Sequence, residues 1–220
     1  MRTPLIKNRA IRPNSARRKA SLAAVAVGLA TIGIGVLPAP AAFAAPPPPR
    51  DRCLQNMAPD VTQTVTHQGN QVGVSFPDGT NPPNGVFPGD VVKVTITGTV
   101  RIDFWGNSYG PSGATGGHEA YWKSLQGINW PFPELNAFSS VARWNNNPGG
   151  WVGNPMRTIS LGSCSSVPSI PVRLLYYIND PGISDNGGQW TIRTDVYRAT
   201  TTCAPGFFYS GIYGCIPRPW

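Results

Sequence analysis

Apolar and polar residues alternate with a period of two along much of the chain, most clearly between Pro171 and Arg198. That period is typical of β-strands, in which successive side chains point to opposite faces. Two runs in this segment each present one mainly apolar face, formed by Val172, Leu174, Tyr176 and Ile178 in the first and by Trp190, Ile192, Thr194 and Val196 in the second. The pattern predicts a hairpin whose loop is Asp180–Gly188.

The same period predicts further strands over residues 61–65, 71–76, 90–102, 137–144 and 156–161. Within the 90–102 strand, Gly98 is expected to mark a bulge or a bend. Segments rich in glycine, proline and asparagine separate the strands, and the chain shows neither a helical pattern nor an internal repeat. We therefore predict an all-β fold, a β-sandwich with jelly-roll topology.

The first 44 residues have the pattern of a signal peptide. Basic residues precede an apolar run, Ala20–Leu37, which is followed by the small-residue site Ala42-Phe43-Ala44. We expect cleavage after Ala44 and export by the general or the twin-arginine route, since Arg17-Arg18 precedes the run. An uncleaved anchor is the alternative, but the run is barely long enough to span a bilayer. The processed chain is therefore expected to be secreted and not inserted in a membrane.

Removing this segment changes the charge of the chain. The whole sequence has 18 basic and 10 acidic residues and a net charge of +8. Seven of the basic residues and none of the acidic ones precede residue 45, so residues 45–220 carry a net charge of about +1. The basic balance is thus no evidence for nucleic-acid binding. We divide the rest into an N-terminal extension (45–85) with a proline-rich spacer and the first strands, a sandwich (86–199) and a cysteine-bounded tail (200–220).

All four cysteines follow the predicted signal peptide, and export into an oxidising space favours two disulfides. Three pairings are open. We favour Cys203–Cys215, which closes a short loop, and Cys53–Cys164, which ties the N-terminal segment to the body. A zinc site is the alternative, but the sequence contains no C-x-x-C pair.

Motifs of catalysis are incomplete. Gly106–Gly110 matches the G-x-S-x-G nucleophile elbow, yet Pro111 and the glycines after it disfavour the helix that the elbow needs. His118 follows with no acid between, and His118-Glu119 lacks the second histidine of a zinc protease because Trp122 stands there. We therefore predict that the protein is not an enzyme.

Oxygen-bearing residues gather in the Asp180–Gly188 loop, where Asp180, Asp185 and Asn186 lie among glycines. Carboxylate, amide and carbonyl oxygens suit a hard cation such as Ca²⁺. The same residues also form ordinary turns, which is the other interpretation. Likewise, the aromatic side chains that flank His118 form either a stacking platform for a sugar or part of the core; they are Trp105, Tyr109, Tyr121 and Trp122.

Four motifs in order, spanning Val86–Tyr197, resemble the PA-I type calcium-dependent, galactose-binding lectins of bacteria. They are Phe87-Pro88-Gly89-Asp90-Val91-Val92, Gly110-Pro111-Ser112-Gly113 with His118, Ala137–Arg143, and Ile178-Asn179-Asp180-Pro181-Gly182 followed by Asp185-Asn186 and Gly188. The loop that begins at Asp180 is shorter than that of the family, apparently by two residues, and Ser184 stands where the family has an aromatic residue.

The resemblance implies a jelly roll with one Ca²⁺ whose coordination is completed by sugar hydroxyls. It implies metal ligands at the side chains of Asp180, Asp185 and Asn186, at the carbonyl of Ile183, and at a carbonyl near Asp103 or Phe104. It also implies that His118 hydrogen-bonds the sugar, and Tyr121 joins the sugar-binding set beside it. The predicted function is secreted, galactoside-like carbohydrate binding. The alternative is a non-catalytic interaction protein of the cell envelope, built on the same sandwich without a functional metal site.

Overall fold

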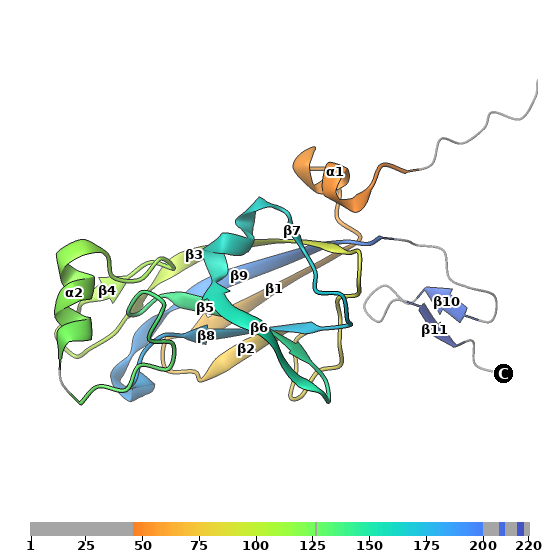
Figure 1. The fold of residues 1–220 in the computed structure, drawn as a ribbon. Coiled ribbons are helices and arrows are strands. Elements are labelled where there is room, and N and C mark those ends of the chain that lie inside the picture. The colour runs from red at the N-terminus through yellow and green to blue at the C-terminus, as the bar shows by residue number, and fades with distance from the viewer. Residues whose placement is uncertain (1–45, 126, 200–206, 210–214, 218–220) are drawn as a thin grey trace, which may run out of the picture. The chain divides into compact units, whose positions relative to one another are not determined.

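Two antiparallel sheets lie face to face and enclose one apolar core (Figure 1). The computed structural model describes residues 46–125, 127–199, 207–209 and 215–217. The first sheet has the order β1-β9-β3-β4, with β7 also paired to β3; its strands are β1 (Val61–Gln68), β9 (Gly187–Tyr197), β3 (Val91–Arg101), β4 (Ser108–Tyr109) and β7 (Ser165–Ser166). The second has the order β2-β8-β5-β6 and contains β2 (Gly73–Phe76), β8 (Arg173–Ile178), β5 (Ser140–Asn146) and β6 (Gly150–Arg157).

This architecture confirms the predicted all-β sandwich, and the jelly-roll topology stays a prediction. Two short strands near the C-terminus, β10 (Phe207–Tyr209) and β11 (Cys215–Pro217), pair with each other. The predicted signal peptide and its cleavage site lie outside the described residues. Among the described residues, no helix has the length and apolar character needed to cross a membrane.

The two most regular strands do not form the predicted hairpin. β8 pairs with β2 and β5, whereas β9 pairs with β1 and β3, so the two strands belong to opposite sheets. Their predicted apolar faces are indeed buried, and they meet across the core, where the hydroxyls of Tyr176 and Thr194 are 2.6 Å apart. Alternation shows which face of a strand is buried but not which strand lies beside it. Residues 179–186 are therefore a crossover between sheets, which pack about 10 Å apart in such folds.

Short helices interrupt the strands where the sequence predicted loops or strands. They are α1 (Pro49–Leu54), α2 (Gly116–Ser124) and the 3₁₀ turns η1 (Thr158–Ser163) and η2 (Ile183–Asp185). Gly116 and His118 lie within α2, in a stretch where the sequence showed no helical pattern. The helix buries none of its residues, and so leaves no apolar stripe in the sequence. The predicted strand over 156–161 is also wrong beyond Arg157, because β6 starts at Gly150 and η1 follows it.

Gly98 marks neither a bulge nor a break in the ladder. β3 and β9 pair in one register from end to end, with Gly98 opposite Trp190. Its φ is +102°, and a Cβ there would lie 2.4 Å from the carbonyl oxygen of Gln189. Glycine is needed at this point because the two backbones come close where the φ is positive.

The predicted disulfide Cys53–Cys164 is present and ties α1 to the residue that follows η1. Both cysteines are buried against Val91 and Tyr197, which form a second small apolar cluster with them. Cys203 lies outside the described residues, so its pairing with Cys215 stays a prediction. The bond joins segments that are 111 residues apart in sequence, and thus fixes the N-terminal segment on the sandwich.

A buried ion pair links the start of β3 to the end of β9. The Arg198 guanidinium donates to Asp90 Oδ2 at 2.6 Å, and both side chains are almost fully buried. The Asp90 carboxylate also accepts backbone N–H bonds from Phe87 and Ala199. The Pro88-Gly89-Asp90 turn that enters β3 is therefore fastened to the segment that leaves β9.

Candidate functional site

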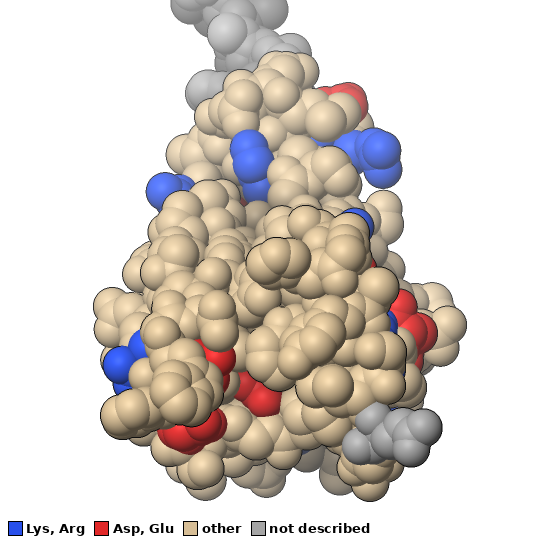
Figure 2. Space-filling view, turned by 90° about the vertical axis from the view of Figure 1, so that its left-hand side faces the viewer, with Lys and Arg blue, Asp and Glu red and all other residues tan. Residues whose placement is uncertain are grey.

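A groove of about 450 Å³ lies beside α2 and is lined in part by Trp122 of that helix. Figure 1 shows α2 at one end of the sandwich. Three carboxylates and three aromatic rings from well-separated segments line it: Asp103, Asp180 and Asp185 with Trp122, Trp130 and Phe138. Figure 2 looks onto this end of the molecule and shows acidic side chains gathered around its lower part. We call this cavity the end groove.

Asn179 holds one wall of the end groove. Its side chain is fully buried at the end of β8, where Oδ1 accepts the N–H of Phe132 at 3.0 Å. Its Nδ2 donates to the carbonyls of Phe132, Leu135 and Asn136 at 2.9 to 3.1 Å. One amide thus contacts four backbone groups of the segment that carries Trp130, with its two N–H groups shared among three carbonyls, and fixes that segment to the sheet.

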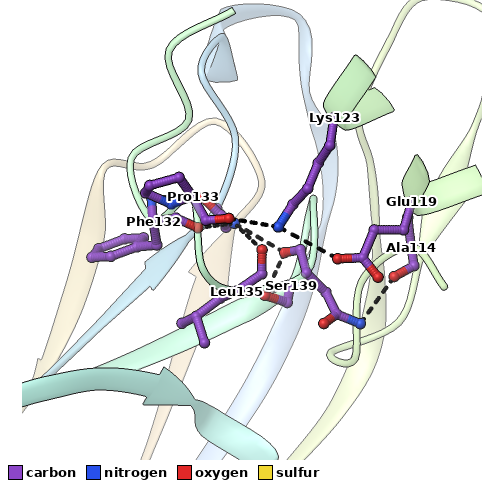
Figure 3. A network of polar contacts seen from close by, with 9 residues as sticks. Ala114, Glu119, Lys123, Phe132, Pro133, Leu135 and Ser139 are labelled. Carbon is purple, nitrogen blue, oxygen red and sulfur yellow. Dashed lines mark hydrogen bonds and ion pairs between the residues drawn. The ribbon is translucent and has the colours of Figure 1, made fainter. Parts of the chain in front are cut away.

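Helix α2 supplies the opposite wall and is held by polar contacts with the same segment (Figure 3). Lys123 Nζ donates to the carbonyl of Pro133 at 2.7 Å. The same nitrogen lies 3.4 Å from Oε1 of Glu119, one turn earlier in α2. Such a short helix is unstable alone, so these tertiary contacts keep it formed. They also place Trp122, whose Nε1 donates to the Tyr109 hydroxyl at 3.1 Å.

Phe138 is the centre of the aromatic wall. Its ring stacks on Tyr109 at 5.3 Å and meets Trp122 and Trp130 edge-to-face at 5.1 and 5.2 Å. The backbone of Phe138 has a φ of +59°, which is unusual for a bulky residue and often accompanies functional sites. The N–H of Phe138 donates to the carbonyl of Asn179 at 2.7 Å, and this bond helps to hold the conformation.

The carboxylate of Asp180 is buried and already hydrogen-bonded. Its Oδ1 accepts the N–H of Gly182 and its Oδ2 accepts Nδ2 of Asn186, each at 2.9 Å. Burial raises the pKa of Asp180, although these two bonds act in the opposite direction. Asn186 also donates to the carbonyl of Gly69, while its own Oδ1 is buried and has no hydrogen-bond partner among the described residues.

The other two carboxylates differ in how far they are engaged. Asp103 accepts the backbone N–H and the side-chain Nδ2 of Asn107 at 2.9 and 2.6 Å. The side-chain bond from Asn107 is the main reason that the pKa of Asp103 is lowered. Asp185 is exposed and accepts no hydrogen bond from any described residue, so its oxygens are open to a ligand in the end groove.

As arranged, the predicted calcium ligands do not form a cage. Both oxygens of Asp180 accept hydrogen bonds, and Asn186 turns its donor, not its oxygen, toward Asp180. Within the part of the chain that the structure describes, no group of three or more His, Cys, Asp or Glu side chains is placed to hold a metal ion. A Ca²⁺ ion takes six to eight oxygens, so the 180–186 segment would have to rearrange around it. Calcium binding stays a prediction.

The remaining predicted site residues lie beside the end groove. His118 and Tyr121 are exposed on α2 and do not line the cavity, although Tyr121 packs against Trp122. Ile183 lies in η2 and lines a neighbouring hollow. Ser108 of the G-x-S-x-G match lies in β4, where its hydroxyl donates to the carbonyl of Gly106.

Sequence reasoning did not identify Trp130, Phe138 or Asn179 as parts of a site. Trp130 directly precedes Pro131 in an irregular segment, so no period placed it near α2. Asn179 looked like one more turn residue, and only its burial reveals its role. The one available signal was a tryptophan, Trp130, in a loop segment, because a large apolar side chain outside the strands often marks a binding surface.

No protein-family model matches this sequence, and neither a curated protein nor a solved structure matches it. The resemblance to PA-I type lectins therefore rests on the four motifs alone.

Proposed function

We propose that this chain is an exported carbohydrate-binding protein that holds its ligand in the end groove. The observation that carries the proposal is the pairing of the Trp122, Trp130 and Phe138 rings with three carboxylates in one cavity. The C–H faces of a sugar pack on aromatic rings, while its hydroxyls donate to carboxylate oxygens in charge-assisted hydrogen bonds.

Details of the cavity support a polar ligand with apolar faces. Asp185 offers free acceptor oxygens, and Nε1 of Trp130 is buried with no hydrogen-bond partner among the described residues. A buried donor without a partner is costly, and a ligand hydroxyl or a water would relieve that cost. The signal-like N-terminus and the disulfide favour action outside the cell.

A glycan array followed by calorimetry tests the proposal, with galactosides among the ligands. We expect Trp130→Ala to weaken binding at least tenfold, because it removes a stacking surface worth about 1 kcal/mol or more beyond its buried area. Trp105→Ala is the matched control, because Trp105 is 85% exposed and does not line the end groove. Absence of any glycan ligand, or equal losses in the two variants, would refute the proposal.

The same titration in EDTA and in millimolar Ca²⁺ tests the calcium prediction. Binding that survives EDTA means that the end groove acts without metal, in the arrangement described above. Binding that needs Ca²⁺, together with a higher melting temperature in its presence, means that Asp180 exchanges its bond from Asn186 for a cation. Asp180→Ala is expected to remain folded and to lose the ligand in both cases.

A further inference from the structure

The outer face of the second sheet carries two adjoining hollows, of about 540 and 440 Å³, which share Val72 and Tyr177. The register explains why these residues look outward. Leu174 and Tyr176 of β8 are fully buried, so Arg173, Leu175 and Tyr177 alternate onto the opposite face. Arg143 pairs with Leu175 on that face.

Two arginines give this face its chemistry. Arg173 is held by neutral acceptors only, Asn145 Oδ1 at 2.7 Å, Asn81 Oδ1 at 2.8 Å and the carbonyl of Pro82. The Arg143 guanidinium lies 4.2 Å from the ring centroid of Trp151, and its Nε is buried with no hydrogen-bond partner among the described residues. Neither arginine pairs with a carboxylate within the described part of the chain.

The nearby acids do not neutralise these charges directly. Asp78 lines one hollow and Asp180 the other. Asp78 accepts the N–H of Gly79, and Asp180 accepts bonds from Gly182 and Asn186, so each carboxylate is engaged within its own surroundings. The arginines therefore remain open to an anionic group supplied by a ligand.

Aromatic side chains accompany the two charges. Trp151 is 48% exposed and meets Tyr177 edge-to-face at 6.1 Å. The hollow that contains both also shares Asp180 and Pro181 with the end groove. Three cavities are thus contiguous, from the end groove past Asp180 and Pro181 to Arg143, and then past Tyr177 to Arg173.

We propose that this outer face binds an acidic glycan chain, one whose sugar units bear carboxylates, as an extension of the end groove. The proposal rests on the proposed function and specifies its ligand as an extended polymer and not a single sugar. Arg143 and Arg173 bind the carboxylates, and Trp151 and Tyr177 pack on the rings. The end groove holds the hydroxyls of the terminal unit, whose own carboxylate points toward the arginines and away from the three aspartates of the groove. A neutral polymer would leave both arginines without a carboxylate partner.

The test is calorimetry of the processed chain with galacturonate oligomers of one to six units and with neutral galactose oligomers of the same lengths. We expect affinity for the acidic series to rise at least tenfold between one and four units, and to fall as salt is added. Arg143→Gln and Trp151→Ala should each remove most of that gain while leaving monosaccharide binding unchanged. Arg50→Gln is the matched control, because it removes the same charge from a residue that is exposed in α1 and lines neither hollow.

The outcomes separate the two proposals. If a single sugar binds but the acidic series shows no length dependence, or if Arg143→Gln and Trp151→Ala change nothing, the extended site is wrong and the end groove stands. If polyglutamate competes as well as the galacturonate hexamer, the face recognises charge alone and the glycan assignment is overturned. If no sugar binds at all, both proposals fall.

Discussion

Asn179 provides the sharpest test of how the end groove is built. Its amide accepts one backbone N–H and donates to three carbonyls of the segment that carries Trp130. Asn179→Ala would leave the N–H of Phe132 and several carbonyls without partners in a buried place. Each such group costs about 1–3 kcal/mol when it is left buried without a partner, and water would reach some of them in the variant. We therefore expect the free energy of unfolding to fall by about 3 kcal/mol.

That loss corresponds to a fall of about 6–12 °C in melting temperature for a domain of this size. Differential scanning calorimetry measures this fall, and Asn154→Ala is the control, because Asn154 is exposed in β6 and its side chain makes no hydrogen bond to any described residue. Asn179→Asp should be at least as harmful as the alanine variant. It keeps the acceptor for Phe132 but turns a carboxylate toward three carbonyls.

The same variants should disable ligand binding before they unfold the sandwich. The segment carrying Trp130 is released from β8, so glycan affinity at 20 °C should fall tenfold or more in Asn179→Ala. A melting temperature of Asn179→Asp within 2 °C of the wild type, or normal glycan binding by Asn179→Ala, would contradict this role of Asn179.

Two further predictions concern the stability of the sandwich. His67 is buried, and its burial lowers the pKa below the usual 6.5; the unfolded chain therefore binds the proton first, and stability falls as pH drops below about 6.5. Melting curves at pH 7.5 and 5.0 should show a smaller acid loss in His67→Gln than in the wild type, and an equal loss would contradict this. For the disulfide, the double variant Cys53→Ala/Cys164→Ala releases a cross-link between residues 111 apart. A loop of that length is worth about 5 kcal/mol in the chain-entropy model, so the melting temperature should drop by about 10 °C or more, and a change under 3 °C would argue against it.

The strands were predictable because burial of one face leaves an alternation of apolar and polar residues along the sequence. Tyr176 and Trp190 fall on the inward faces that the sequence assigned to them. Pairing was not predictable, since β8 and β9 follow each other in sequence yet lie in different sheets. A connection rich in Asp, Asn and Gly suits a tight turn and a crossover equally well, and only the long-range partners of each strand decide between them.

From the sequence alone we singled out two of the acids that line the end groove and, of its three aromatic rings, only Trp122. The sequence singled out the side chains of Asp180 and Asp185, whereas the resemblance implied only a backbone carbonyl near Asp103 or Phe104. All three aspartates line the end groove, and their role as ligands stays a prediction. Their hydrogen bonds could not be foreseen, because the Asp180–Asn186 and Asp103–Asn107 pairs arise from loop geometry. Trp130 and Phe138 are brought together by Asn179 and by a positive φ, neither of which leaves a period in the sequence.

The crossover between the sheets links these observations. Asn179 at one end is bonded to the 132–136 segment, and Asn186 at the other is bonded to Gly69, which precedes β2. Asp180 and Pro181 between them border both the end groove and the nearer hollow of the outer face. Because the crossover is fixed at both ends, a chain bound in the end groove meets an ordered ridge and not a freely moving loop. An extended ligand would therefore lose little free energy to ordering the protein at the point where it turns from one surface to the other.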